Sequence, residues 1–278
     1  MTRFWLISAI GIGLLFGIVF ALYPETDLAI AELFFDARKA RFPLATSQDW
    51  NLVRNIASWA PVIFLLPAVF ALLRKLAYPR LPIAMAPSVI LFLLGSFLLG
   101  PGLVVNALLK ENWGRPRPNS VEQFAGAAHF EPWWRPSSEC VRNCSFASGE
   151  TAVAFWTVAP ASLAPPQIRP VALGAAVLFG TSVGTLRVMF GRHFVTDVVF
   201  AGVITVILVI LLYRFMLAPL RRSDARLERS LERFALTMHR RMGATLAEAG
   251  QGLARAGLAL SGAGERLSRT AALAKEAD

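Results

Sequence analysis

Long blocks of apolar residues, rather than alternating apolar and polar positions, occupy most of the chain up to about residue 218. A helix needs about 20 mostly apolar residues to cross the hydrocarbon core of a bilayer. Six segments approach this length, and the fourth and fifth are short: about 4–22, 52–73, 86–109, 148–164, 171–187 and 196–217. The pattern therefore predicts an all-α fold, a polytopic membrane protein built as a bundle of six transmembrane helices.

The first apolar segment could be a removable signal peptide. Its apolar run is longer than such peptides carry, however, and no small-residue cleavage motif precedes YPETD. We expect a retained membrane anchor.

Lysine and arginine follow the second, fourth and sixth segments, in LRKLAYPR, QIRP and YRFMLAPLRR. Cytoplasmic loops carry an excess of these residues, so the bias, together with Arg3, predicts cytoplasmic N- and C-termini. The loops at about 23–51 and 110–147 would then lie on the opposite side of the membrane. The second of these loops is itself rich in cations, so this orientation holds only if those cations have another role.

The last 60 residues contain no apolar block, which divides the chain into a membrane domain, 1–218, and a tail, 219–278. Leucine and alanine alternate through the tail in a heptad pattern: Leu246, Ala249, Leu253, Ala256, Leu260, Ala263 and Leu267. Such a pattern is typical of an amphipathic helix. Two interpretations remain open: a cytoplasmic helix on the membrane surface, and a seam for homo-oligomers.

The composition supports a membrane protein, with 55% hydrophobic and 17% charged residues. The net charge of +10 could indicate a nucleic-acid partner, but no nucleic-acid motif is present and the cations are scattered over loops and tail. We therefore expect no nucleic acid and take anionic lipid head groups as the counter-charge.

Three short segments carry the candidate chemistry. The first, KENWGRPRP, places Lys110, Arg115 and Arg117 at the end of the third apolar segment, where two prolines stiffen the chain. An ammonium and two guanidinium groups at a membrane interface suit the oxygens of a phosphate. The alternative is that these are ordinary flanking cations whose charged ends extend to the interface.

The second segment, SFASGE, precedes the fourth apolar block. Ser148 and Gly149 would lie at a helix N-terminus, where free amides and the helix dipole attract anions. Equally, Ser148 can be a simple helix cap and Glu150 an acid of the first turn.

The third segment, LRVMFGRHFVTDVV, contains Arg187, His193 and Asp197. Histidine and aspartate four residues apart share one helix face, so Asp197 could accept a hydrogen bond from one imidazole nitrogen and leave the other free as a base or nucleophile. A lone histidine is usually structural, but a carboxylate inside a membrane is costly unless it is paired or functional.

The spacing within these segments resembles the three signature motifs of the type 2 phosphatidic acid phosphatase superfamily, over about 88 residues. The first motif is complete at Lys110 and Arg117-Pro118. The third matches at Arg187, His193 and Asp197, with Leu186 in place of a serine. The second matches only at Ser148-Gly149, with Ala147 in place of a proline and Glu150 in place of a histidine.

The resemblance implies a metal-independent phosphatase without a cofactor. It implies that His193 attacks phosphorus to form a phosphohistidine, that Asp197 orients it, and that five residues hold the phosphate oxygens: Lys110, Arg117, Ser148, Gly149 and Arg187. Arg115 is an additional candidate phosphate contact. These implied roles agree with the chemistry of the residues themselves, since the cations suit phosphate oxygens. Phosphoryl transfer depends mainly on positioning the substrate and on neutralising the negative charge spread over its oxygens.

Glu150 occupies the position of the family histidine that protonates the leaving oxygen. A carboxyl group can do this only when protonated, and its usual pKa is about 4.3. Burial and a nearby phosphate favour the protonated form, whereas the helix dipole and four cations favour the ionised form. We expect Glu150 to act as a carboxylic acid; the alternatives are a structural or electrostatic role and a loss of efficient catalysis.

Cys140 and Cys144, both cysteines of the protein, lie just before the second motif. On an oxidising periplasmic face they could form a disulfide that holds the loop preceding Ser148, and free thiols are the alternative.

These observations and the resemblance predict an integral-membrane lipid phosphatase of the bacterial inner membrane that acts on a phosphomonoester or a pyrophosphate of a lipid at the periplasmic face. The second motif, the first loop and the cysteines resemble the lipid A phosphatase branch, with undecaprenyl pyrophosphate and phosphatidylglycerophosphate as competing substrates. A lipid phosphotransferase using the same pocket and a catalytically weak lipid-binding scaffold are the other hypotheses.

Overall fold

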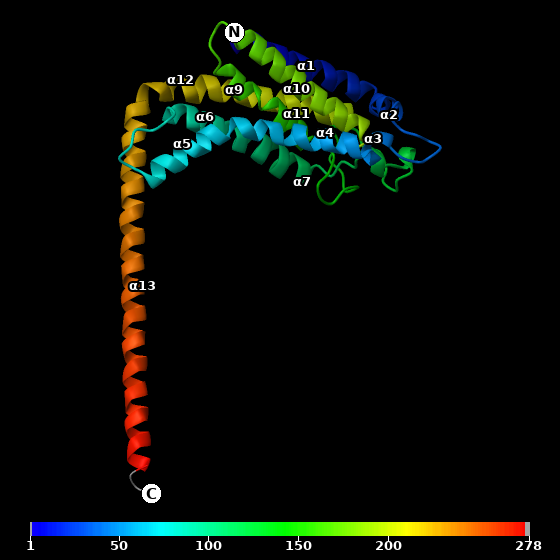
Figure 1. The fold of residues 1–278 in the computed structure, drawn as a ribbon. Helices are drawn as coiled ribbons and strands as arrows, with labels where there is room; N and C mark the ends of the chain where they lie inside the picture. Colours follow the sequence, from blue (N-terminus) through cyan, green and yellow to red (C-terminus); the bar gives the residue numbers. More distant parts are fainter. Residues whose placement is uncertain (1, 276–278) are drawn as a thin grey trace. The chain divides into compact units, whose positions relative to one another are not determined.

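The computed structural model describes residues 2–275, and most of them are helical (Figure 1). Within this range no strand forms; two isolated bridges, Asp36–Arg41 and Val121–Ala128, link short extended segments. The all-α prediction is therefore confirmed.

The chain forms two compact units. The first comprises Met1–Leu72 and Ile83–Ala225, and the second comprises Leu73–Pro82 and Arg226–Asp278. Every residue predicted for the site belongs to the first unit.

The first unit begins with a long helix and a series of shorter ones: α1 (Thr2–Leu22), α2 (Glu25–Glu32), α3 (Pro43–Thr46), α4 (Gln48–Trp59), η1 (Ala60–Phe64) and the start of α5 (Leu66–Ala77). A second long helical stretch follows as α6 (Pro87–Phe97), η2 (Leu98–Leu109) and α7 (Lys110–Asn112). Pro101, which has no N–H to donate, lies in η2, where the helix is wider than an α-helix.

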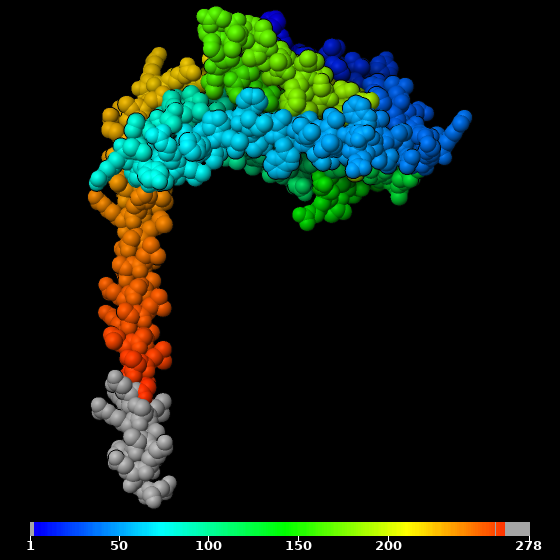
Figure 2. Space-filling model, viewed as in Figure 1, coloured from blue at the N-terminus to red at the C-terminus, as the bar shows by residue number. Residues whose placement is uncertain are grey.

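The loop after α7 contains two single turns, η3 (Pro118–Ser120) and η4 (Glu122–Phe124). The remaining helices of the unit are α8 (Gly149–Phe155), α9 (Val158–Ser162), α10 (Arg169–Met189), α11 (Val195–Leu212), η5 (Tyr213–Leu217), α12 (Ala218–Leu220) and η6 (Arg221–Ser223). Helix α11 packs against α1, α8 and α10, and α4 packs against α8 and α10. In Figure 2, α4 lies on the visible surface of the unit.

Four helices in the described residues are long and apolar enough to cross a membrane: Arg3–Leu22, Pro87–Asn112, Arg169–Met189 and the helix that begins at Val195. A fifth span results if Gln48–Phe64 and Leu66–Ala77, which meet at a 44° bend, cross together. A bundle of exactly six spans is therefore not confirmed.

The difference lies in the predicted segment 148–164, which the structure breaks into α8 and α9. The hydroxyl of Thr157 donates to the carbonyl of Ala154, and Pro160 has no N–H to offer. Neither half is long enough to span a bilayer alone. Instead, α8 is buried against α10 and α11, which places its N-terminus among the predicted site residues.

The second unit consists of Leu73–Pro82 and most of α13 (Asp224–Lys275). Lys75 is buried there and contacts Glu228 (3.3 Å) and Glu232 (3.7 Å). The side chains of Leu246, Leu253 and Leu260 on α13 are exposed.

Candidate active site

A polar cavity of about 290 Å³ lies in the first unit. Five sequence-predicted residues line it: Lys110, Arg117, Glu150, Arg187 and His193. Its other lining residues are Ala45, Asn51, Arg54, Asn143, Phe190 and Arg192. The three motifs thus meet at one cavity, and helix α4 adds residues that the motifs do not contain.

His193 is buried just before α11. Its Nδ1 atom lies 2.7 Å from the carbonyl oxygen of Ser145. A carbonyl oxygen can only accept, so Nδ1 must carry the proton, and Nε2 keeps a free lone pair. Burial first, and then the charges of Arg187, Arg117 and Lys110, lower the pKa of His193 well below its usual value. The imidazole is therefore neutral at physiological pH, as a nucleophile requires.

Asp197 does not hydrogen-bond His193 as the sequence led us to expect, because their nearest atoms are 3.9 Å apart. Its carboxylate is already occupied. It accepts from Arg115 (2.6 Å), from the backbone N–H of Phe194 (2.7 Å) and from the hydroxyl of Ser145. Asp197 thus holds Ser145, whose carbonyl oxygen in turn orients the imidazole.

Arg115 lies outside the cavity, although the sequence made it a candidate phosphate contact. Its guanidinium group is fully buried and donates to Asp197, Thr196 (2.8 Å) and Asp27 (2.9 Å). Its Cζ atom also lies over the ring of Phe194, 4.4 Å from the ring centre. Although burial acts to lower it, the two carboxylates raise the pKa of Arg115. Arg115 is a buried link between α2 and α11.

Arg117 lines the cavity and donates to the backbone and side-chain oxygens of Asn143, at 2.7 and 2.8 Å. Burial and then Arg192 lower the pKa of Arg117, which reflects the crowding of positive charge here. Just before Ser145, the sulfur atoms of Cys140 and Cys144 are bonded to each other, with Cα atoms 5.7 Å apart. The disulfide closes the loop that presents Asn143.

Ser148 and Gly149 are buried behind the cavity and do not line it. The hydroxyl of Ser148 pairs with that of Thr151 (2.8 Å), and its backbone N–H donates to the carbonyl of Asp197. A Cβ atom at Gly149 would clash with Oδ1 of Asn106, so the close approach of α8 to η2 requires glycine.

Glu150 lies in the first turn of α8 and contacts α4. Its carboxylate accepts from Nε of Arg54 (3.1 Å) and from the hydroxyl of Ser58 (3.0 Å), and it lies 3.5 Å from the guanidinium group of Arg187. Sequence reasoning missed Arg54 and Ser58. One signal was available: Arg54 is a cation inside the predicted apolar segment 52–73, where charged residues are usually functional.

Arg187 leaves one donor unused. Its Nε atom is buried and has no hydrogen-bond partner among the residues that the structure describes. Buried donors are nearly always paired, so this unpaired N–H is an exception among the described residues, and Arg187 itself lines the cavity. In the same described range, no group of three or more histidine, cysteine, aspartate or glutamate side chains has the arrangement of a metal site.

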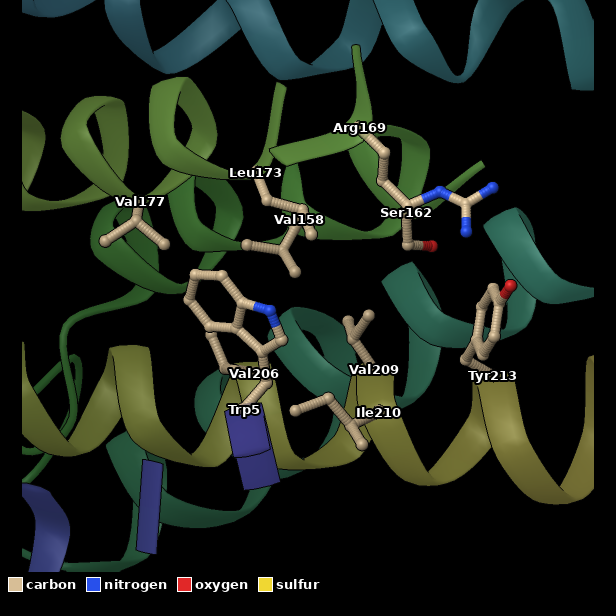
Figure 3. A pocket seen from close by; sticks show the side chains of 10 residues that line it. All are labelled: Trp5, Val158, Ser162, Arg169, Leu173, Val177, Val206, Val209, Ile210 and Tyr213. Atoms are coloured by element: carbon tan, nitrogen blue, oxygen red, sulfur yellow. The ribbon is translucent and has the colours of Figure 1, made fainter. Parts of the chain in front are cut away.

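A second, mostly apolar cavity of about 230 Å³ lies between α1, α9, α10 and α11 (Figure 3). Ser162, Arg169 and Tyr213 lie at one end of it and Val177 at the other. None of the predicted site residues lines this cavity.

The chain is similar in sequence to known proteins. The profile of the PAP2 superfamily matches residues 89–221, which contain all three motifs. A lipid A 4'-phosphatase of Francisella tularensis subsp. novicida is 34% identical over 217 residues, covering 78% of this chain and 97% of the relative. A lipid A 4'-phosphatase of Rhizobium leguminosarum is 32% identical over 193 residues, covering 65% and 83% of the two chains. No solved structure matches significantly.

Proposed function

This chain belongs to the PAP2 superfamily, within its lipid A phosphatase-like branch, and is a membrane lipid phosphatase of the phosphoric monoester hydrolase class; we propose that it removes the 4'-phosphate of lipid A. The relatives' names supply this substrate. The reaction is proposed to occur at the periplasmic face of the bacterial inner membrane, with both termini in the cytoplasm.

The observation that carries the proposal is the charge of the cavity. Arg54, Lys110, Arg117, Arg187 and Arg192 line it, against the single acid Glu150. Five cations and one carboxylate leave a net charge of about +4, which suits a phosphomonoester dianion and the spread charge of its transition state. The guanidinium group of Arg187, which lines the same cavity, can donate to a phosphate oxygen.

In the proposed mechanism, Nε2 of His193 attacks phosphorus. A P–N bond forms, the bond between phosphorus and the leaving oxygen breaks, and the leaving oxygen takes a proton from a water molecule, which leaves hydroxide. The hydroxide then attacks phosphorus, the P–N bond breaks, inorganic phosphate is released and the neutral imidazole is restored. Asp197 acts through Ser145, whose carbonyl oxygen keeps Nδ1 of His193 protonated throughout and so leaves the lone pair of Nε2 available for the attack. Lys110, Arg117 and Arg187 hold the phosphate oxygens, while Ser148 and Gly149 shape the N-terminus of α8 behind them.

Two apolar cavities beside this site support a lipid substrate. One of them, about 400 Å³, lies between Trp50, Val53 and Ala57 of α4 and residues 179–189 of α10. The other, about 520 Å³, shares Phe179 with it and extends along the protein to Phe64. Asn51 and Arg54 of the phosphate cavity alternate with Trp50 and Val53 on α4, so the two sites adjoin.

This apolar groove, defined by the lining of both cavities, extends from Trp50 to Phe64. At about 1.5 Å per helical residue it is roughly 20 Å long, enough for an acyl chain. A chain in the groove would place its phosphate among the cations.

The decisive experiment is phosphate release by the purified protein from a panel of lipids. We expect turnover of lipid A and loss of its 4'-phosphate, identified by mass spectrometry, with His193→Ala as the inactive control. Preference for undecaprenyl pyrophosphate or phosphatidylglycerophosphate would contradict the proposed substrate. Transfer of the phosphate to a second lipid would indicate a phosphotransferase. Binding of lipid phosphates without turnover would indicate a scaffold protein.

A further inference from the structure

Glu150 occupies the position where the superfamily motif has its histidine, and the structure surrounds it with hydrogen-bond donors. Nε of Arg54 lies 3.3 and 3.1 Å from its two oxygens, and the hydroxyl of Ser58 lies 3.0 Å from one of them. Arg187 approaches the other oxygen at 3.5 Å. These contacts join α8 to α4 and α10.

All of these partners stabilise the ionised carboxylate. A proton on Glu150 would have to displace a donated hydrogen bond and would weaken the attraction of two guanidinium groups. This environment differs from that of a carboxyl group used as an acid, which apolar surroundings usually keep protonated. The contacts therefore favour the electrostatic role among the alternatives that the sequence left open.

Arg54 and Arg187 both keep donors free for a ligand. Arg54 contacts Glu150 through Nε, and its terminal amino groups have no described protein partner, although the residue lines the phosphate cavity. Arg187 contacts the same carboxylate and lines the same cavity. A carboxylate that fixes two guanidinium groups in this way pre-organises them for a phosphate.

Building on the proposed function, we infer that Arg54, which lies outside the three motifs, is a phosphate ligand and that Glu150 is the positioning residue that holds it. A histidine at position 150 could not anchor Arg54 in this way, because it carries no negative charge. The second motif departs from the family pattern by having Glu150 in place of a histidine, and α4 carries the additional cation Arg54. The ion pair between these two residues accounts for both features.

The test combines Arg54→Ala, Arg54→Lys, Glu150→Gln and the double variant Arg54→Ala/Glu150→Gln. Two quantities are measured: binding of inorganic phosphate by calorimetry, which needs no turnover, and kcat and KM for an alkyl and an aryl phosphate. Arg135→Ala, a substitution at an exposed arginine outside the cavity, is the matched control. Size-exclusion chromatography verifies folding, and Arg54→Lys replaces Arg54→Ala if the alanine variant does not fold.

We expect Arg54→Ala to weaken phosphate binding by roughly 10- to 100-fold, the effect of losing charge-assisted hydrogen bonds. Glu150→Gln should weaken it by a similar factor and slow both substrates equally, and the double variant should be no worse than the poorer single one, since both changes remove the same interaction. Arg54→Lys should bind phosphate better than Arg54→Ala but less well than the wild type. Lysine keeps the positive charge but lacks the planar set of donors of the guanidinium group.

Unchanged phosphate binding in Arg54→Ala would overturn the role of Arg54. A loss in Glu150→Gln confined to the alkyl phosphate, whose leaving oxygen needs a proton, would overturn the positioning role and support the acid. A wild-type protein that binds phosphate through Arg54 but turns over no lipid phosphate would contradict the proposed function and leave this inference intact.

Discussion

Nδ1 of His193 lies 2.7 Å from the carbonyl oxygen of Ser145 and is thereby committed as a hydrogen-bond donor. The imidazole is oriented by a backbone oxygen, and Asp197 contributes by accepting the hydroxyl hydrogen of the same serine. Both links reach the nucleophile through a loop that lies 48 residues away in the sequence. His193 and the loop that carries Ser145 therefore act as one unit.

Replacing the nucleophile gives the first prediction. His193→Ala should abolish turnover and the radiolabelled phosphoenzyme trapped under alkaline conditions, because no other side chain at the cavity offers a free imidazole nitrogen. Ser145→Ala should retain the phosphoenzyme at a lower rate, since the orienting carbonyl remains. Normal labelling of His193→Ala would contradict the assignment.

The second prediction concerns the pKa of His193. Since burial and nearby cations lower its pKa, the imidazole should stay neutral as pH falls through 6.5 and gain a proton only at more acidic pH. Removing a positive charge with Arg117→Gln should raise the pKa, but not fully to its usual value, because burial persists. NMR of histidine-labelled protein, in a background of His129→Gln and His239→Gln, measures both values. A downward shift in Arg117→Gln would contradict the electrostatic account.

The buried Arg115 gives the third. Arg115→Met would leave the carboxylates of Asp27 and Asp197 without their shared cation, and breaking a buried ion pair costs about 3–5 kcal/mol. We expect a marked loss of thermal stability, partly recovered by adding Asp27→Asn. Arg135→Met, at an exposed arginine, should have little effect. A stable Arg115→Met protein would show that the network contributes little.

The apolar groove gives the fourth. Ala57→Trp and Ala175→Trp should fill it and raise KM for long-chain lipid phosphates by about 10-fold or more, while a water-soluble aryl phosphate is turned over normally. Leu178→Trp, on an exposed position of α10 outside the groove, is the control. Equal losses on both kinds of substrate would mean that the tryptophans disturb the phosphate site instead.

The tail gives the fifth. If the seam from Leu246 to Leu267 mediates self-association, ending the chain after Met242 should reduce cross-linked oligomer and leave specific activity unchanged. This end point retains Asp224, which caps α6 at Ser88, and both acidic partners of Lys75. In the full chain, Leu253→Lys should have the same effect and Gln251→Lys should not. Undiminished cross-linking would favour the surface-helix interpretation.

The sequence alone determined the fold class and predicted five of the residues that line the candidate site. Long apolar blocks require helices in a bilayer because unpaired backbone groups are costly there. The spacing within each motif is local, so it could be recognised without a structure. The helix count could not be settled in this way, since the break near Thr157 depends on side-chain and proline contacts within an otherwise apolar run.

Tertiary structure decided which partner each polar group has. Arg115 reaches Asp27, 88 residues away, instead of the phosphate cavity, and Arg54 reaches Glu150 across 96 residues. Asp197 accepts hydrogen bonds from Arg115 and Ser145 and none from His193. No local pattern encodes these choices, because a charged group buried among helices takes whichever opposite charge the packing brings within hydrogen-bond distance.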